Sequence, residues 1–339
     1  MLSWHIFGGL FLGWSLGAND ASNVFGSAVG ARMISFRKAA ILCSIFVILG
    51  AVIQGSGATG TINSLGNIDL LLGSFATAFS AAFSVYLMSY FGMPVSTSQV
   101  VVGAIIGWNL FSGQSTDFNV LKKIFLAWAY SPVLGGLFSV LLYLLIKKVL
   151  DVVKFHLFRR DVILRYALII AGIIGSYSLG ANNIANVMGV FVGSVNLPSI
   201  IIGKLQIDTL EQLFFIGGLA ISLGVLTFSH KTMKTLGNGI FKLSTEAALA
   251  VVLSHSVVLF IFSSTSLKLF LESIGLPSFP LVPVSSSQTV VGAIIGIGLL
   301  KNAYNIKYSL LGKIVLAWIS SPIIAGMISF LTLFMLSKI

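Results

Sequence analysis

The sequence predicts an all-α integral membrane protein made of two inverted-topology repeats with broken or re-entrant helices. Composition is the first observation: 57% of the 339 residues are hydrophobic and only 9% are charged. The mean hydropathy of +1.03 lies far above that of soluble domains. The second observation is internal repetition, because three sequence patterns occur in the same order in both halves.

Several apolar stretches are long enough, or nearly so, for the roughly 20 residues that a helix needs to cross a bilayer. They are residues 39–52, 70–91, 124–146, 214–228 and 314–336. The segment from Met1 lacks a basic region and a small-residue cleavage site, so we expect it to remain as the first span. The single cysteine, Cys43, lies in an apolar run and is interpreted as a core residue.

The three repeated patterns are close in sequence as well as in order. They are GANDASNVFGSAVG at 17–30 with GANNIANVMGVFVG at 180–193, PVSTSQVVVGAIIGWNL at 94–110 with PVSSSQTVVGAIIGIGL at 283–299, and KIFLAWAYSPVLGG at 123–136 with KIVLAWISSPIIAG at 313–326. The charged stretch 147–165 divides the chain into a first transmembrane repeat, 1–146, and a second, 166–339. We interpret this stretch as a cytoplasmic linker.

The number of crossings in the first repeat decides the orientation of the second. The count is five if 70–91 and 94–111 each traverse the bilayer, and three if together they enter and return. Both counts are odd, so the second repeat begins on the opposite side and the repeats are inverted. Secondary transporters build a binding site near the membrane midplane from inverted repeats of this kind.

Basic residues lie in short clusters between spans, which excludes a continuous nucleic-acid-binding face despite the net charge of +11. With an external N-terminus, fifteen fall on one side and five on the other, so the positive-inside rule predicts a multi-pass cell-membrane protein with both termini extracytoplasmic. The fifteen are Arg32, Arg37, Lys38, Lys147, Lys148, Lys154, Arg159, Arg160, Arg165, Lys231, Lys234, Lys242, Lys301, Lys307 and Lys313; the five are Lys122, Lys123, Lys204, Lys268 and Lys338.

The first motif places an acid inside an apolar segment. Asp20 costs at least ~2.5 kcal/mol to insert, so it indicates function. The flanking glycines and Asn19, Ser22 and Asn23 predict local unwinding, which would expose backbone carbonyls. Carboxylate, amide and carbonyl oxygens suit a hard cation, and sodium or a proton on Asp20 are the two candidates. The second copy provides three amides at the corresponding positions: Asn182, Asn183 and Asn186.

The second motif predicts an anion site. Pro94 and Pro283 are expected at the first position of a helix, which places three hydroxyl residues in each first turn. They are Ser96, Thr97 and Ser98 in the first half and Ser285, Ser286 and Ser287 in the second. Free backbone N–H groups and the positive end of the helix dipole attract anions there. Two such sites brought face to face could surround one tetrahedral oxyanion.

At these residues the chain resembles the inorganic phosphate transporter (PiT) family, whose members carry a GAND and a PVST motif in each half. The resemblance implies two inverted repeats and symport of inorganic phosphate with sodium or protons. It implies that the two hydroxyl triplets, with Asp20, bind phosphate. The cation ligands that it implies are Asn19, Asp20, Asn23, Asn182, Asn183 and Asn186, with sodium at Asp20, Asn23, Asn183 and Asn186 as one option.

Four departures from the family pattern bear on the site. Asn183 stands where the family usually has a second Asp, and Gln99 and Gln288 replace the usual His. Val47 stands where the family often has an acid early in the second span, and Glu246 matches the partner of that acid in the second half. We include Gln99, Gln288 and Glu246 among the candidate cation ligands. The stretch 263–281 has no counterpart in the first half.

Other classes of function remain as alternatives. A sulfate or other oxyanion permease would use the same hydroxyls, and a passive anion channel or receptor would bind without coupling. Small residues on the surface would permit a homodimer. No nucleotide motif or paired nucleophile and base is present, so we expect neither an enzyme nor a cofactor. His5, His156, His230 and His255 are scattered and are interpreted as packing or interface residues.

Overall fold

The computed structural model describes residues 4–66, 68, 70–153, 156–202, 205–238, 240–301 and 306–338. Lys154 and Lys204, which were assigned to the two basic sets, lie outside these residues. The elements in chain order are η1 (Trp4–Ile6), α1 (Phe7–Gly30), α2 (Phe36–Gln54), η2 (Gly55–Ala58), α3 (Thr59–Leu65), α4 (Leu71–Tyr90), α5 (Thr97–Ser112), α6 (Phe118–Val153), α7 (Leu157–Met188), η3 (Gly189–Phe191), β1 (Ile200–Ile202), β2 (Leu205–Ile207), α8 (Thr209–Phe228), α9 (His230–Asn238), α10 (Thr245–Ser263), α11 (Thr265–Ser273), α12 (Ser286–Lys301) and α13 (Tyr308–Leu336).

The expected all-α membrane fold is confirmed. Among the described residues, seven helical segments are long and apolar enough to cross a membrane: Phe36–Leu65, Leu71–Tyr90, Phe118–Val153, Phe158–Phe191, Thr209–Phe228, Thr245–Ser263 and Tyr308–Leu336. The five apolar stretches picked out in the sequence lie largely within them. α1 is less apolar because it carries the polar motif, yet every residue from Ser15 to Ala28 is buried. It is therefore a core helix. A short antiparallel hairpin, β1 with β2, precedes α8.

Corresponding helices of the two halves make reciprocal contacts. α1 of the first half packs on α8 of the second, and its counterpart α7 packs on α2 of the first. In the same way α5 packs on α13, and its counterpart α12 packs on α6. Glycines allow the close approach. A Cβ added at Gly17 would lie 1.9 Å from the Ile221 carbonyl oxygen, and one added at the equivalent Gly180 would lie 2.1 Å from that of Val47. Equivalent glycines therefore serve equivalent helix contacts in both halves.

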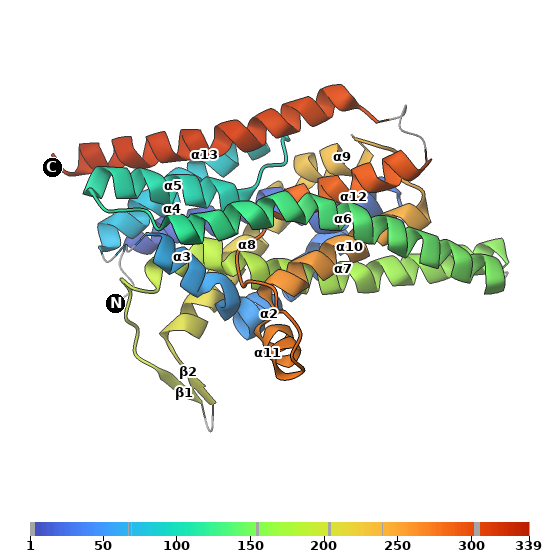
Figure 1. The fold of residues 1–339 in the computed structure, drawn as a ribbon, viewed down its shortest axis with the longest axis horizontal. Coiled ribbons are helices and arrows are strands. Elements are labelled where there is room, and N and C mark those ends of the chain that lie inside the picture. The colour runs from blue at the N-terminus through green and yellow to red at the C-terminus, as the bar shows by residue number, and fades with distance from the viewer. Residues whose placement is uncertain are drawn as a thin grey trace.

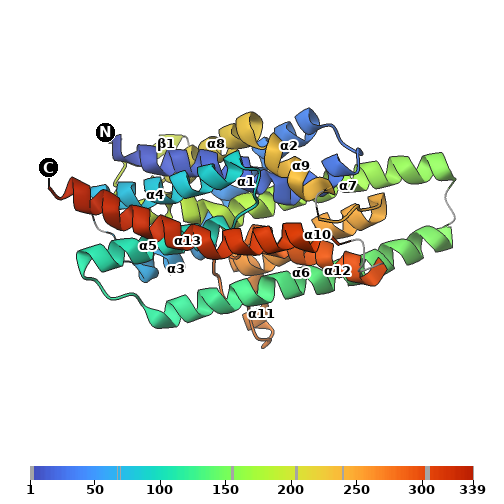
Figure 2. The same cartoon turned by 90° about the horizontal axis from the view of Figure 1, so that it is seen from above.

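Corresponding helices also run in opposite directions along the long axis of the molecule. α6 runs away from the end that carries both termini, whereas α13 runs toward it (Figure 1; Figure 2). α4 runs from the end with the termini toward the middle, and α5 runs back to that end (Figure 2). α5 and α12 begin near the middle and point to opposite ends.

Two groups of basic residues lie near helix ends at the same end of the molecule. α1 ends and α2 begins toward the end opposite both termini, with Arg32 and Arg37 beside them, and α6 ends and α7 begins there too, with Lys147 and Arg159 nearby (Figure 2).

The expected unwinding of the first motif is wrong. α1 is continuous from Phe7 to Gly30, and α7 continues through the second copy to Met188 before the short η3 turn. The polar side chains find partners on neighbouring segments, so the helical backbone stays intact. The breaks lie instead between α4 and α5 and between α10 and α12, where the stretch absent from the first half forms α11.

Candidate functional site

All four motif copies lie in the interior. Asp20 is 1% exposed, Thr97 2% and Ser286 3%. The first motif and its copy occupy buried stretches of α1 and α7, and the hydroxyl triplets stand at the starts of α5 and α12. Of the candidate binding residues in these motifs, Gln288 is half-buried and the others are buried. The sequence motifs therefore form one internal polar region rather than separate surface features.

Each hydroxyl triplet begins with a helix cap. Ser96 is the N-cap of α5, and its Oγ accepts a hydrogen bond of 3.3 Å from the Gln99 backbone N–H. Ser285 Oγ accepts the equivalent bond of 3.2 Å from Gln288. Pro94 and Pro283 thus precede the helices instead of occupying their first position, which corrects the expected register. The remaining free N–H groups of each first turn form a positive helix end.

Asn19 positions the segment ahead of α5. Its Nδ2 donates to Ser89 Oγ at 2.9 Å and to the Met93 carbonyl at 3.1 Å, and its Oδ1 accepts from the Val95 N–H at 3.1 Å. A buried extended segment needs such partners for its backbone groups. Asn19, a candidate cation ligand, thus uses its amide to hold this segment and the end of α4.

Asn182 makes equivalent hydrogen bonds in the second half. Its amide donates to the Val284 carbonyl and accepts from the Val284 N–H, both at 3.2 Å. These contacts hold the segment ahead of α12. The first asparagine of each motif copy therefore fixes the position of the hydroxyl triplet in its own half.

The two triplets meet at one turn of α1. Thr97 Oγ1, from the start of α5, donates to Asp20 Oδ1 at 3.5 Å. Asn23 Nδ2 donates to Ser286 Oγ, from the start of α12, at 2.9 Å. Residues three apart on a helix lie on the same face, with Cβ atoms about 5–6 Å apart. Asp20 and Asn23 therefore bring the hydroxyls of both halves to a single place.

Two buried amide oxygens of the first motif and its copy have no partner among the described residues. They are Asn23 Oδ1 and Asn186 Oδ1, which occupy equivalent positions in the two motif copies. Asn186 Nδ2 donates to Asn183 Oδ1 at 3.1 Å, and Asn183 Nδ2 donates to the Leu179 carbonyl at 3.1 Å. A buried oxygen without a donor calls for a water molecule or an ion. Amide oxygens of this kind are suitable ligands for a hard cation.

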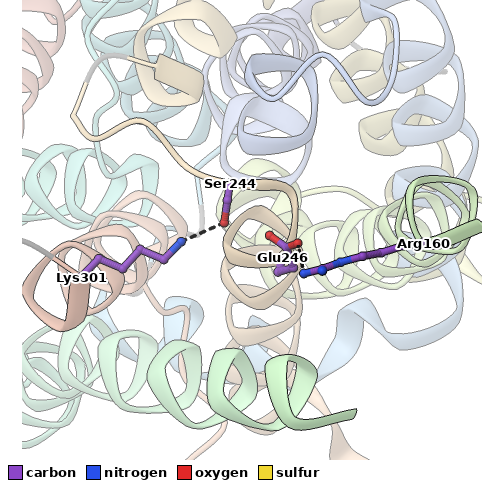
Figure 3. Close-up of polar contacts among 4 residues, drawn as sticks. All are labelled: Arg160, Ser244, Glu246 and Lys301. Atoms are coloured by element: carbon purple, nitrogen blue, oxygen red, sulfur yellow. Dashed lines mark hydrogen bonds and ion pairs between the residues drawn. The ribbon is translucent and has the colours of Figure 1, made fainter. Parts of the chain in front are cut away.

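Glu246 lies apart from these residues. It is the second residue of α10 and accepts a hydrogen bond of 2.7 Å from Arg160 Nη2, forming an ion pair (Figure 3). Beside it Lys301 Nζ donates to Ser244 Oγ at 2.8 Å. Nine residues separate Glu246 from His255, about 13 Å along a helix, and His255 is the α10 residue that contacts Ser286. The structure thus assigns Glu246 to an ion pair at the helix end, away from the motifs.

Gln99 lines a groove between α5, α6 and α13 together with Trp128 and Pro322. The side-chain oxygens of Gln99 and Gln288 have no partner among the described residues. Within the same part of the chain, no group of three or more His, Cys, Asp or Glu residues could hold a metal ion. Oxygen ligands from the motifs remain the candidates for a cation.

His255 is the residue that sequence reasoning missed. It was interpreted as a packing residue, but its Nε2 lies 2.8 Å from Ser286 Oγ, and the side chain is fully buried. The signal was present in the sequence, because an ionisable side chain inside an apolar span indicates function by default. The neighbouring α10 hydroxyl, Ser254, instead donates to the Gly135 carbonyl at 2.7 Å.

The chain resembles known proteins over nearly its whole length. A protein of Methanocaldococcus jannaschii, provisionally described as a phosphate permease, is 27% identical over 321 residues, which cover 95% of this chain and 93% of that protein. A protein of Pyrococcus furiosus with the same description is 25% identical over 397 residues, covering 95% and 92%.

One solved structure, described as the sodium-dependent phosphate transporter, superimposes with a TM-score of 0.76 at 24% identity and covers 99% of this chain and 98% of that one. This likeness shows a shared fold. The family model described as the phosphate transporter family matches residues 16–277 and 276–339. The match confirms the resemblance drawn from the motifs: the chain belongs to the phosphate transporter family, whose members are transporters and not enzymes.

Proposed function

We propose that this protein is a sodium-coupled symporter of inorganic phosphate that works by alternating access. One observation carries the proposal: Thr97 of one half and Ser286 of the other contact the same turn of α1 through Asp20 and Asn23. An oxyanion at this point would be held by both halves. Its binding would therefore depend on their relative position, which is the requirement for coupling transport to a conformational change.

The phosphate ligands are the two helix starts. Ser96, Thr97 and Ser98 and their counterparts Ser285, Ser286 and Ser287 provide hydroxyls, and the first turns of α5 and α12 provide backbone N–H groups. Asp20 is the one carboxylate among the motif residues. Monohydrogen phosphate can donate its proton to that carboxylate, whereas sulfate has no proton to donate. This difference favours phosphate over sulfate.

The cation ligands are Asp20, Asn23 Oδ1 and Asn186 Oδ1. The amide oxygens are buried and lack a donor, and a cation beside Asp20 would offset the cost of a buried carboxylate. The solved structure that shares this fold is described as sodium-dependent, which supports sodium rather than a proton. Gln99, Gln288 and Glu246 are not needed as ligands.

In the transport cycle the two halves would change their relative position, so that the binding site opens first to one side of the membrane and then to the other. Their reciprocal contacts and opposite directions support an inverted arrangement in the membrane, with 1–146 and 166–339 as the repeats and 147–165 as a linker. The gathering of basic segments at one end supports a cytoplasmic location for that end and extracytoplasmic termini in the cell membrane.

Uptake of radiolabelled phosphate into proteoliposomes tests the proposal. We expect accumulation under an inward sodium gradient, none when potassium replaces sodium at fixed pH, and no competition from excess sulfate. Asp20→Asn should abolish accumulation, while Asp117→Asn, the same change at an exposed helix start, should leave it intact. Equal uptake in potassium would refute sodium coupling. Sulfate that blocks uptake would refute the choice of phosphate.

A further inference from the structure

The Ser286 hydroxyl has two neighbours besides the proposed anion. Asn23 Nδ2 donates to its Oγ at 2.9 Å from α1, and His255 Nε2 lies 2.8 Å from the same atom on α10. All three side chains are buried, with exposed fractions of 3% or less. The equivalent hydroxyl in the first half, Thr97, instead faces an acceptor, Asp20 Oδ1. The two halves thus present their central hydroxyls differently.

The neighbours of the Ser286 hydroxyl limit where its hydrogen can point. A hydroxyl has one hydrogen to donate and two lone pairs that accept. The Asn23 amide, which can only donate through Nδ2, fills one lone pair. If His255 carries its proton on Nε2, it fills the second. Neither neighbour then accepts the Ser286 hydrogen, which must point toward a third group.

The other tautomer of His255 is less favourable. With the proton on Nδ1, an N–H donor would be buried without a partner, because His255 Nδ1 has none among the described residues. Buried polar groups are nearly always hydrogen-bonded, and orphaned N–H groups are rarer than unpaired acceptors. The Nε2–H form leaves only a lone pair unsatisfied at Nδ1. The surroundings therefore favour His255 as the donor.

We propose that His255 is a positioning residue which, together with Asn23, commits the Ser286 hydroxyl hydrogen to the transported phosphate. This inference rests on the proposed function and adds a residue outside the four motifs. In the first half the Thr97 hydroxyl donates to Asp20, whereas in the second half the Ser286 hydroxyl keeps its hydrogen for the anion. His255 acts through Ser286 and needs no contact with phosphate.

Phosphate exchange in proteoliposomes provides the test, since it needs no ion gradient. His255→Leu and His255→Met remove the donor and should raise the half-saturating phosphate concentration about tenfold, as expected for one lost hydrogen bond to a charged group. His255→Gln keeps an N–H donor and should restore values near those of the wild type. Ser286→Ala should match the donor-free variants, and adding His255→Leu to Ser286→Ala should cause no further loss.

Two controls separate this inference from a structural role and from the proposed function. Ser254→Ala removes a buried α10 hydrogen bond that does not reach Ser286 and should leave the half-saturating concentration unchanged. A purely structural histidine would lower the amount of folded protein in all His255 variants, Gln included, without changing this concentration, and that result would overturn the inference. Absence of exchange in the wild type would overturn the proposed function itself.

Discussion

Gly103 marks the point where α5 touches α13, and replacing it with alanine is the sharpest test of the packing. The added Cβ would lie 2.1 Å from the Pro322 carbonyl oxygen and 2.7 Å from the Pro322 carbonyl carbon and Cα. Ordinary contact begins at 3.4 Å, so the helices must separate by about 1.3 Å, and such overpacking costs about 1–3 kcal/mol. Because α5 also carries Thr97, a shift on the order of 1 Å should reduce uptake roughly 10- to 100-fold.

The chain provides both a reporter and a matched control. Cys43 is the only cysteine and is fully buried, so a thiol-reactive fluorogenic dye reports unfolding on heating. Gly103→Ala should lower the midpoint of unfolding, and so should Gly292→Ala, whose Cβ would lie 2.1 Å from the Pro132 carbonyl oxygen. Gly312→Ala adds the same methyl group in α13 with no atom within 4 Å. It should preserve or raise the midpoint through helix propensity.

The result that would refute this reasoning is specific. If Gly103→Ala and Gly312→Ala gave the same midpoint and the same phosphate uptake as the wild type, α5 and α13 could not be in the contact described. A lowered midpoint with normal uptake would retain the contact but reject the link between the position of α5 and phosphate binding.

Three further predictions follow from the polar contacts. Asn19→Ala leaves the buried Val95 N–H without its partner and should lower the free energy of unfolding by about 1–3 kcal/mol, measured with the same dye; an unchanged midpoint would contradict the assigned role. Asn183→Asp buries a second carboxylate, so we expect a lower midpoint without sodium that added sodium restores, and equal midpoints with and without sodium would contradict it. Arg160→Gln breaks a partly exposed ion pair with Glu246 and should cost at most about 1 kcal/mol without altering the half-saturating phosphate concentration; a changed concentration would place this pair in the site.

Much of the fold was predictable because membrane insertion and repetition leave local signals. The apolar stretch 70–91 contains α4, the stretch 314–336 falls within α13, and the repeated patterns correspond to helices with reciprocal contacts. The unwinding expected around Asp20 was wrong for a reason that lies outside the motif. Asn19 finds partners on α4 and on the segment before α5, and Asn23 finds one on α12, so α1 remains helical.

The sequence predicted which residue types form the site, but not which side chains contact one another. The sequence by itself determined the membrane class, the two repeats, the single carboxylate at Asp20 and the two hydroxyl triplets, because hydropathy, repetition and helix capping depend on neighbours along the chain. Only the tertiary structure decided that Asn23 meets Ser286, that His255 joins them, and that Glu246 pairs with Arg160 instead. The partner of a buried polar group is set by the segments that pack against it, and these come from distant parts of the sequence.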